Sequence, residues 1–221
     1  SCKWVHRKKM EPNKSIRCKS RVVARGFSQQ EGVDFFNTYA PTMSLGSMRT
    51  VLAHAARRKM AVHNVDMNTA HLCGKLEVPI YMAVPKGYKP KNDKEKKLME
   101  QGKAVCLLKK SLYGLRQSAH VWNKTFVSSL TQMGFVQTQS DPCVFVNMET
   151  GTVLGLWVDD LLIAYDKKQH LEKFLRDLSK NYKFKNLGPA KCCLGMEIES
   201  GPAGGHSLSQ KTYIRHWGRK G

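Results

Sequence analysis

The alternation of hydrophobic and polar residues predicts strands and helices that intermix along most of the chain. Apolar residues at intervals of three and four predict helices over about 47–59, 118–133 and 168–181. Alternating or short apolar runs predict strands at 2–9, 15–25, 61–67, 77–84, 104–108, 144–147, 153–157 and 161–165, and a strand pair within 183–198. Because helices and strands do not alternate regularly, we expect an α+β fold with an antiparallel sheet.

Local signals set the expected ends of some of these elements. Ser47 is suited to cap the first helix, because a serine side chain can accept a hydrogen bond from a free backbone amide. Gly134 is placed to end the helix predicted over 118–133, since glycine favours the backbone conformation found there. The segment 86–103 holds seven lysines and almost no apolar residues, so we expect a surface loop.

Charge narrows the class of protein. The 221 residues include 37 Lys+Arg and 17 Asp+Glu, so the formal net charge is +20 at pH 7. With 41% hydrophobic residues the chain can still bury a core. A folded protein this basic usually binds a polyanion, and nucleic acid is favoured over a membrane surface. The simpler alternatives are a charged surface that only keeps the protein soluble and a ribosome-associated protein.

Part of the excess charge lies at the N-terminus. Residues 1–25 contain nine lysines and arginines and one acidic residue, and Pro12 and Asn13 mark a turn between two strands. We therefore predict a basic β-hairpin. No apolar run approaches the ~18 residues that a membrane-spanning helix needs, so we expect no membrane partner.

Seven cysteines are present, an odd number without a C-x-x-C pair. This pattern favours free thiols in a reducing compartment over a disulfide framework or a zinc site. No secretion signal is visible, and we interpret both chain ends, Ser1 and Gly221, as positions within a longer protein.

Three carboxylates stand where apolar strands end. Asp159 and Asp160 lie between two apolar runs, where we expect a hairpin turn, and Asp66 ends another apolar strand. Adjacent carboxylates in apolar surroundings repel each other and lose hydration, so at least one pKa should rise unless a cation compensates. Grouped together, they would suit two Mg²⁺ ions about 4 Å apart, which serve phosphoryl transfer. A polar turn and a helix cap are the simpler interpretations. Together with the net charge, the carboxylates favour a two-metal nucleotidyl transferase or nuclease.

Six segments carry more specific motifs. They are R-C-K-S-R-V-V-A-R-G-F-S-Q-Q-E-G-V-D-F-F-N-T-Y-A-P from Arg17, V-D-M-N-T-A-H-L from Val65, K-K-S-L-Y-G-L-R-Q-S from Lys109, S-D-P-C-V-F-V from Ser140, W-V-D-D-L-L-I-A from Trp157 and L-G-M-E-I from Leu194. In this order they resemble the reverse transcriptase domain of copia-type (pseudovirus) LTR retrotransposon Pol polyproteins, over about residues 3–215. The Y-G-L-R-Q and V-D-D motifs at this separation are jointly very specific.

The resemblance implies the fingers and palm of a right-hand polymerase, with an antiparallel palm sheet backed by helices. The fingers-like parts would be residues 1–42 and 74–116, and the palm 43–73 and 117–200. Residues 201–221 would begin the connection towards a thumb. The thumb and the RNase H domain would lie beyond this chain.

The resemblance also implies roles for individual residues. The catalytic residues, which would also bind two Mg²⁺ ions that Mn²⁺ can replace, are Asp66, Asp159 and Asp160. The residues implied to bind the incoming nucleotide are Lys19, Arg21, His71 and Gln117. The residues implied to lie at the primer and template are Trp157, Leu194 and Gly195.

Two of these positions depart from the family pattern. Five residues after the first aspartate the family usually has Phe or Tyr, whose ring excludes a ribose 2′-hydroxyl; here the residue is His71. We therefore expect weaker rejection of ribonucleotides. Trp157 stands where the family usually has Tyr, and it either perturbs the primer 3′-hydroxyl or packs harmlessly against the sheet.

The implied activity is that of an RNA-directed DNA polymerase, which extends a DNA primer on an RNA template with dNTPs. The implied partners are the integrase and RNase H parts of a Pol polyprotein, and the implied location is cytoplasmic, including virus-like particles. Two alternatives stay open. One is a catalytically inert nucleic-acid-binding remnant with the same fold, and the other, from the charges and carboxylates alone, is a two-metal nuclease.

Overall fold

The computed structural model describes residues 1–10, 15–68, 70–201 and 205–217, without the side chains of His71 and His216. The chain divides into two compact units, Ser1–Ala40 with His71–Thr125 and Pro41–Ala70 with Phe126–Gly221. Both contain antiparallel strands, and the predicted mixture of helices and antiparallel sheets is confirmed. The assignment of these parts to fingers and palm stays a prediction. The turn predicted at Pro12 and Asn13 lies outside the described residues.

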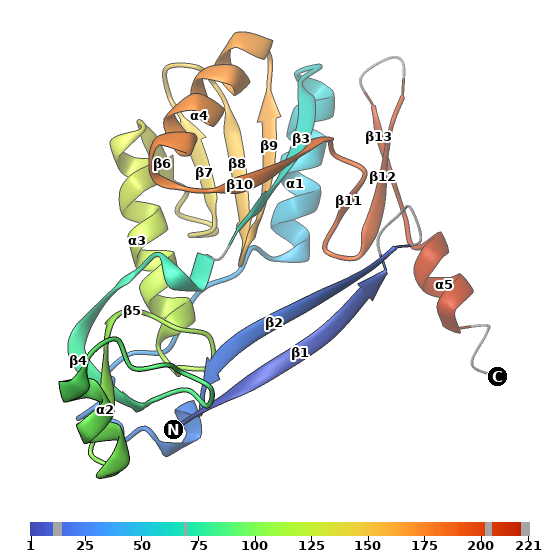
Figure 1. Ribbon diagram of the computed structural model, residues 1–221. Coiled ribbons are helices and arrows are strands. Elements are labelled where there is room, and N and C mark those ends of the chain that lie inside the picture. The colour runs from blue at the N-terminus through green and yellow to red at the C-terminus, as the bar shows by residue number, and fades with distance from the viewer. Residues whose placement is uncertain (11–14, 69, 202–204, 218–221) are drawn as a thin grey trace. The chain divides into compact units, whose positions relative to one another are not determined.

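The second unit is built on a six-stranded sheet with the strand order β10-β3-β9-β8-β7-β6 (Figure 1). All neighbouring strands are antiparallel. The strands are β3 (Ala61–Met67), β6 (Phe135–Gln137), β7 (Val144–Asn147), β8 (Val153–Trp157), β9 (Asp160–Tyr165) and β10 (Phe184–Pro189). The bounds of β3, β7 and β8 are those predicted from the apolar runs.

Helices cover both faces of this sheet, which explains why its central strands are continuous apolar runs. α1 (Leu45–Arg57) contacts β3, β8 and β9 on one face. α4 (Lys168–Asn181) lies on the opposite face (Figure 1), where the ring of Phe174 packs edge-on against Phe135 with centroids 5.4 Å apart. α3 (Ser118–Gln132), which ends before Gly134 as predicted, runs from the first unit into the second.

A small three-stranded sheet follows β10. Its strands, in order, are β11 (Cys192–Cys193), β12 (Met196–Ser200) and β13 (His206–Ser209), and α5 (Lys211–Trp217) comes after them. The strand pair predicted within 183–198 is therefore β11 with β12, whereas β10 pairs with β3. None of the helices in the described part of the chain has both the length and the hydrophobicity needed to cross a membrane.

The first unit contains two separate two-stranded sheets. β1 (Cys2–Met10) pairs with β2 (Ile16–Ala24), and β4 (Lys75–Ala83) pairs with β5 (Val105–Lys110). Two short 3₁₀ helices are η1 (Gly26–Ser28) and η2 (Ala70–Leu72), the latter at the border between the units. The buried residues that join the two sheets are Ala24, Ile80, Met82 and Leu115.

The prediction of a loop over 86–103 is wrong, because this segment contains a helix, α2 (Asp93–Glu100). Its N-cap Asn92 accepts a hydrogen bond from the backbone amide of Glu95 at 2.8 Å. The helix buries none of its residues, so it carries no apolar stripe that a sequence pattern could reveal.

The prediction that Ser47 caps the first long helix is also wrong. The helix begins at Leu45, and its N-cap is Ser44, whose Oγ accepts a hydrogen bond from the Ser47 amide at 3.0 Å. Ser47 is thus the partner of the cap, three positions further along, as the geometry of a helix N-terminus requires. Two serines at this spacing cannot be told apart by residue type alone.

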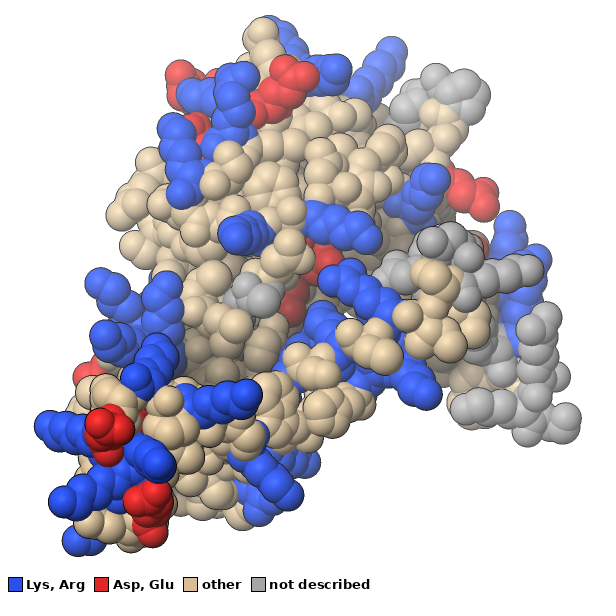
Figure 2. Space-filling view, viewed as in Figure 1, with Lys and Arg blue, Asp and Glu red and all other residues tan. Residues whose placement is uncertain are grey.

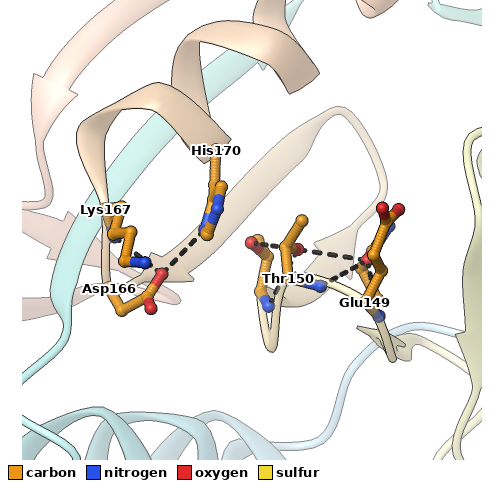
Figure 3. A network of polar contacts seen from close by, with 7 residues as sticks. Glu149, Thr150, Asp166, Lys167 and His170 are labelled. Atoms are coloured by element: carbon orange, nitrogen blue, oxygen red, sulfur yellow. Dashed lines mark hydrogen bonds and ion pairs between the residues drawn. The ribbon is translucent and has the colours of Figure 1, made fainter.

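Polar contacts close the β7–β8 turn and the start of α4 (Figure 3). In the turn, Asn147 Oδ1 accepts a hydrogen bond from the Thr150 amide at 2.9 Å. Before α4, Asp166 Oδ1 accepts hydrogen bonds from the Lys167 amide at 2.7 Å and from His170 Nδ1 at 2.8 Å. Since the N-cap Lys167 makes no side-chain capping bond, Asp166 takes over part of that function.

Candidate active site

The register of the six-stranded sheet brings two of the predicted carboxylates onto neighbouring strands. Asp66 of β3 pairs with Asp160 of β9, and Asp160 pairs on its other side with Trp157 of β8. Asp66 in turn pairs with Lys185 of β10. Paired residues of an antiparallel sheet project from the same face. Trp157, Asp160, Asp66 and Lys185 therefore form one row across four strands, which we call the acidic row.

Asp159 lies in the turn beside this row. Val158 and Asp159 alone join β8 to β9, so the hairpin predicted from the sequence is present, with Asp160 as the first residue of β9. Val158 has a φ of 53°, and a β-branched residue in this region costs about 1–3 kcal/mol. The backbone carbonyl of Asp159 accepts a hydrogen bond from the Met67 amide at 2.7 Å. β3 thus helps to hold the turn, and Asp66 lies within a strand and does not cap a helix.

The three carboxylates influence one another electrostatically. Loss of hydration raises the pKa of Asp160 above its ordinary value, and the negative charges of Asp66 and Asp159 raise it further. The Asp160 side chain still reaches solvent, whereas the Oδ1 atom of Asp159 is shielded from it. A cation among these carboxylates would be attracted by all three and would lower the pKa of Asp160.

The residues fit a divalent cation by their chemistry. Carboxylate oxygens are the donors that Mg²⁺ prefers, and the raised pKa of Asp160 is the effect expected of neighbouring acids without a counter-ion. Within the described residues, however, no three His, Cys, Asp or Glu side chains are arranged to hold one ion. The side chains would have to rotate to do so. The role of Asp66, Asp159 and Asp160 as metal ligands stays a prediction.

A pocket of about 480 Å³ opens beside Asp160. Its lining includes the three residues predicted to lie at the primer, namely Trp157, Leu194 and Gly195. Leu194 and Gly195 form the two-residue turn between β11 and β12 with φ values of 51° and 74°, the positive values of a type I′ turn. The end of β8 and the β11–β12 turn therefore bring the predicted primer residues next to Asp160, a predicted catalytic residue, while their contact with primer stays a prediction.

Cys193, a buried free cysteine, also lines this pocket. Burial raises the pKa of this thiol to about 12, and the charge of Asp160 contributes to the rise. The thiol is therefore protonated at neutral pH. It forms part of the wall of the pocket, with no nucleophilic character.

The β1–β2 hairpin of the first unit separates its charges by face. Arg7 pairs with Lys19, Lys9 with Arg17, Val5 with Arg21 and Lys3 with Val23. Because paired residues share a face, one face carries Lys3, Arg7, Lys9, Arg17, Lys19 and Arg21, and we call it the cationic face. Figure 2 shows basic side chains gathered along this hairpin. Both predicted triphosphate-binding residues of the hairpin, Lys19 and Arg21, belong to the cationic face.

The Y-G-L-R-Q segment supports the base of the hairpin. The guanidinium carbon of Arg21 lies 5.3 Å from the centre of the Tyr113 ring, within the range of a cation–π contact. Gly114 has a φ of +90°, and a Cβ atom placed on it would lie 2.1 Å from the carbonyl oxygen of Ala24. Only glycine permits this approach of the two backbones.

Gln117, the predicted nucleotide-binding glutamine, is only 5% exposed. Its Nε2 donates to the Asp34 carbonyl at 2.9 Å, and its Oε1 accepts from Gln29 Nε2 at 3.1 Å. Gln29 Oε1 also accepts a hydrogen bond from the Arg116 amide at 2.9 Å. Gln29 therefore fixes the orientation of the Gln117 amide. A nucleotide could contact only the part of that amide left free by these two hydrogen bonds, unless the bonds break and the side chain moves.

Sequence reasoning missed Gln29 and Lys185. Gln29 lies inside the motif that begins at Arg17, but its type and position do not reveal a partner so far along the chain. Lys185 could be found only by pairing β10 with β3, which no local pattern encodes. The side chain of His71 lies outside the described residues, and its predicted effect on ribonucleotides stays a prediction.

Comparison with known proteins shows the family to which the chain belongs. The family described as "Reverse transcriptase (RNA-dependent DNA polymerase)" matches residues 1–219. The Retrovirus-related Pol polyprotein from transposon TNT 1-94 of Nicotiana tabacum is 39% identical over 201 residues, which are 89% of this chain and 14% of that protein. The Retrovirus-related Pol polyprotein from transposon RE1 of Arabidopsis thaliana is 33% identical over 216 residues, or 96% of this chain and 14% of that protein.

A more distant relative is the Transposon Ty1-DR5 Gag-Pol polyprotein of Saccharomyces cerevisiae, 28% identical over 217 residues, with 89% of this chain and 12% of that protein covered. This chain thus spans about one seventh of the length of the first two relatives. The family match and the transposon relatives confirm the copia-type resemblance predicted from the motifs. The chain belongs to the reverse transcriptase (RNA-dependent DNA polymerase) family.

Proposed function

We propose that this chain is the RNA-directed DNA polymerase domain of a copia-type retrotransposon Pol polyprotein. In this proposal it joins a dNTP to the 3′-hydroxyl of a DNA primer on an RNA template and releases pyrophosphate. The observation that carries the proposal is the pairing of Asp66 with Asp160, next to Asp159, in a chain of this family. The resemblance to Pol polyproteins implies integrase and RNase H parts, and these are the proposed partners.

The second unit acts as the palm in this proposal. Asp66, Asp159 and Asp160 supply the oxygen atoms that hold two divalent cations. When bound, Mg²⁺ or Mn²⁺ would favour ionisation of the primer 3′-hydroxyl and neutralise charge on the phosphates. The protein itself positions the carboxylates. The register of β3 and β9 pairs Asp66 with Asp160, and the hydrogen bond from the Met67 amide to the Asp159 carbonyl holds the turn that contains Asp159.

The first unit acts as the fingers. Lys19 and Arg21 on the cationic face bind the triphosphate, and the guanidinium of Arg21 can hold two phosphate oxygens at once. Tyr113 supports that guanidinium from behind. Gln117 contacts the nucleotide sugar and base, with its amide oriented by Gln29.

The pocket beside Asp160 receives the primer terminus in this proposal. Trp157 and the Leu194-Gly195 turn support the terminal nucleotide while its hydroxyl faces the carboxylates. The family resemblance gives His71 the position under the sugar of the incoming nucleotide, where histidine would reject ribonucleotides less strictly than Phe would. Comparison of dNTP and rNTP incorporation by the natural sequence and by His71→Phe tests this point, and equal discrimination by both would refute it.

Primer extension on an RNA template tests the function as a whole. The natural chain and its Asp159→Asn/Asp160→Asn variant are supplied with a labelled DNA primer, dNTPs and Mg²⁺ or Mn²⁺. Asp93→Asn, which alters an exposed carboxylate at the start of α2, is the matched control. We expect extension by the natural chain and by the control, and none by the double variant.

The alternatives predict other outcomes of the same assay. An inert remnant binds the RNA–DNA hybrid, measured by gel shift, but extends no primer. A nuclease shortens the template and needs no dNTP. Extension that survives in the double variant would contradict the proposed role of the carboxylates.

A further inference from the structure

The face of the β1–β2 hairpin opposite the cationic face has a different character. Its ten residues include a single charged one, Lys8, and the set is Cys2, Trp4, His6, Lys8, Met10, Ile16, Cys18, Ser20, Val22 and Ala24. Most of this face is open to solvent: Trp4 is 45% exposed, Ile16 63% and Met10 77%. A strongly basic hairpin thus presents a second, nearly neutral face that carries aromatic rings.

Two of these rings are arranged as a pair. The indole of Trp4 and the imidazole of His6 are 9° from parallel, with centroids 6.1 Å apart. Successive bases of a nucleic acid stack about 3.4 Å apart, so a base held between two rings needs about 6.8 Å. The 6.1 Å between the two ring centroids is about 0.7 Å shorter than that spacing. The two rings would have to move apart by this small distance to admit a flat heterocycle between them.

Hydrogen bonds hold each ring by its polar edge. Trp4 Nε1 donates to the carbonyl of Lys86 at 2.9 Å, and His6 Nδ1 lies 2.8 Å from Ser20 Oγ. Both contacts lie within the first unit and leave the faces of the rings available. The rings are therefore oriented before any ligand arrives, which reduces the entropy that binding would cost.

We propose that Trp4 and His6 form a stacking site for an unpaired base of single-stranded RNA. The six cations of the cationic face attract the phosphate backbone to this hairpin, and the rings of the neutral face then hold a base. Single-stranded nucleic acid is the ligand that combines a polyanionic backbone with flat, exposed heterocycles, and stacking on aromatic side chains is its usual mode of binding.

This inference rests on the proposed function only in its choice of RNA, since the template ahead of a growing primer is single-stranded. The site lies wholly within the first unit and uses none of the carboxylates. Its test therefore needs neither Mg²⁺ nor dNTP, and it can succeed in a chain that extends no primer.

The experiment measures binding of two labelled probes to the full chain by fluorescence anisotropy at fixed salt. One probe is a 12-nucleotide RNA without self-complementarity, and the other is an abasic phosphodiester of the same length. We expect Trp4→Ala to weaken RNA binding by about 5- to 100-fold and to leave binding of the abasic probe unchanged. His6→Ala should act in the same direction, and Trp217→Ala, which alters another exposed tryptophan, should have no effect.

A second variant separates stacking from support of the fold. Trp4→Phe loses the bond to Lys86 but keeps a ring, so it should retain most of the RNA affinity. If Trp4→Phe loses as much affinity as Trp4→Ala, or if Trp4→Ala weakens both probes equally, the stacking site is refuted. The Asp159→Asn/Asp160→Asn variant should bind RNA like the natural chain, which separates this inference from the fate of the proposed polymerase.

Discussion

The cationic face of the hairpin and the acidic row of the six-stranded sheet are both rows of residues that antiparallel pairing places on one face. The cationic face comes from two strands that are neighbours in the sequence, and five of its six cations belong to exposed residues, while Arg21 is half-buried. The acidic row draws on β8, β9, β3 and β10, and it contains two carboxylates, one of which has lost part of its hydration.

The difference separates cations that act through their sum, such as Arg7 and Lys9, from carboxylates that share one site. Exposed cations act on a polyanion through their sum, so each contributes a similar, salt-dependent share. Carboxylates that share one site act together, and the loss of one leaves the others without their function. The hairpin should therefore tolerate changes that the acidic row does not.

The largest expected effect on folding concerns the glycines that support the two regions. In Gly114→Ala the new Cβ meets the backbone oxygen of Ala24 at 2.1 Å and φ is +90°, so we expect a loss of more than about 3 kcal/mol. In Gly155→Ala of β8 the Cβ meets Met43 Sδ at 2.4 Å, a flexible side chain, and about 1–3 kcal/mol should be lost. Urea denaturation measures both, and a smaller loss for Gly114→Ala would contradict the account of the hairpin base.

A smaller effect is expected for Gln29, which positions Gln117. Gln29→Ala removes the donor to Gln117 Oε1 and the acceptor of the Arg116 amide. We expect the KM for dNTP to rise about 5- to 10-fold, the equivalent of one lost hydrogen bond of about 1 kcal/mol, with little change in kcat. Steady-state primer extension gives both constants. Gln30→Ala, at an exposed neighbouring position, is the control, and an equal rise in that variant would refute the positioning role.

Removal of one cation from the cationic face should have a modest and uniform effect. Arg7→Ala and Lys9→Ala should each weaken RNA binding a few-fold and reduce the slope of log affinity against log salt by about 0.7, the value for one phosphate contact on a single strand. Anisotropy titrations at several salt concentrations measure this slope. A large loss confined to one of the two variants would show that the charges are not interchangeable.

The smallest expected effect is a gain of stability at the acidic row. The pKa of Asp160 is higher in the folded state than in the unfolded state. The carboxyl group therefore contributes most to the stability of the fold below the ordinary pKa of an aspartate, and this contribution is lost as the pH rises through the raised pKa. Asp160→Asn should remove this loss and stabilise the chain at pH 7, by at most about 1 kcal/mol because the site is partly solvated. Thermal unfolding at pH 4 and pH 7 tests the sign, and destabilisation at pH 7 would contradict it.

The parts of the fold that the sequence predicts best are those with a short-range pattern. The apolar runs located β3, β7 and β8, and the helical spacing located α4. α2 was not predicted because it buries none of its residues and so has no apolar stripe. Ser44 was not predicted as the N-cap because Ser47, three residues later, is also a serine and could form the same hydrogen bond. A local hydrophobic pattern does not predict a helix, or its first residue, where an N-cap hydrogen bond is the contact that fixes it.

The candidate site likewise contains residues that a local pattern predicts and residues that only the fold brings together. Asp159 and Asp160 stand out in the sequence because two acids interrupt apolar strands. The pairing of Asp66 with Asp160, the row completed by Trp157 and Lys185, and the bond between Gln29 and Gln117 join distant segments. Such contacts follow from strand order and register, which the chain sets only when it folds.

The most direct test of the central claim, that Asp66 and Asp160 act as one catalytic centre, is a double-mutant cycle. Primer extension rates on an RNA template are measured for Asp66→Asn, Asp160→Asn and the double variant. Each single variant should lose at least about 100-fold, because several kcal/mol of charge stabilisation are removed, and the double variant should be no slower than the slower single one. Losses that multiply in the double variant, or a single variant that keeps the natural rate, would contradict the claim.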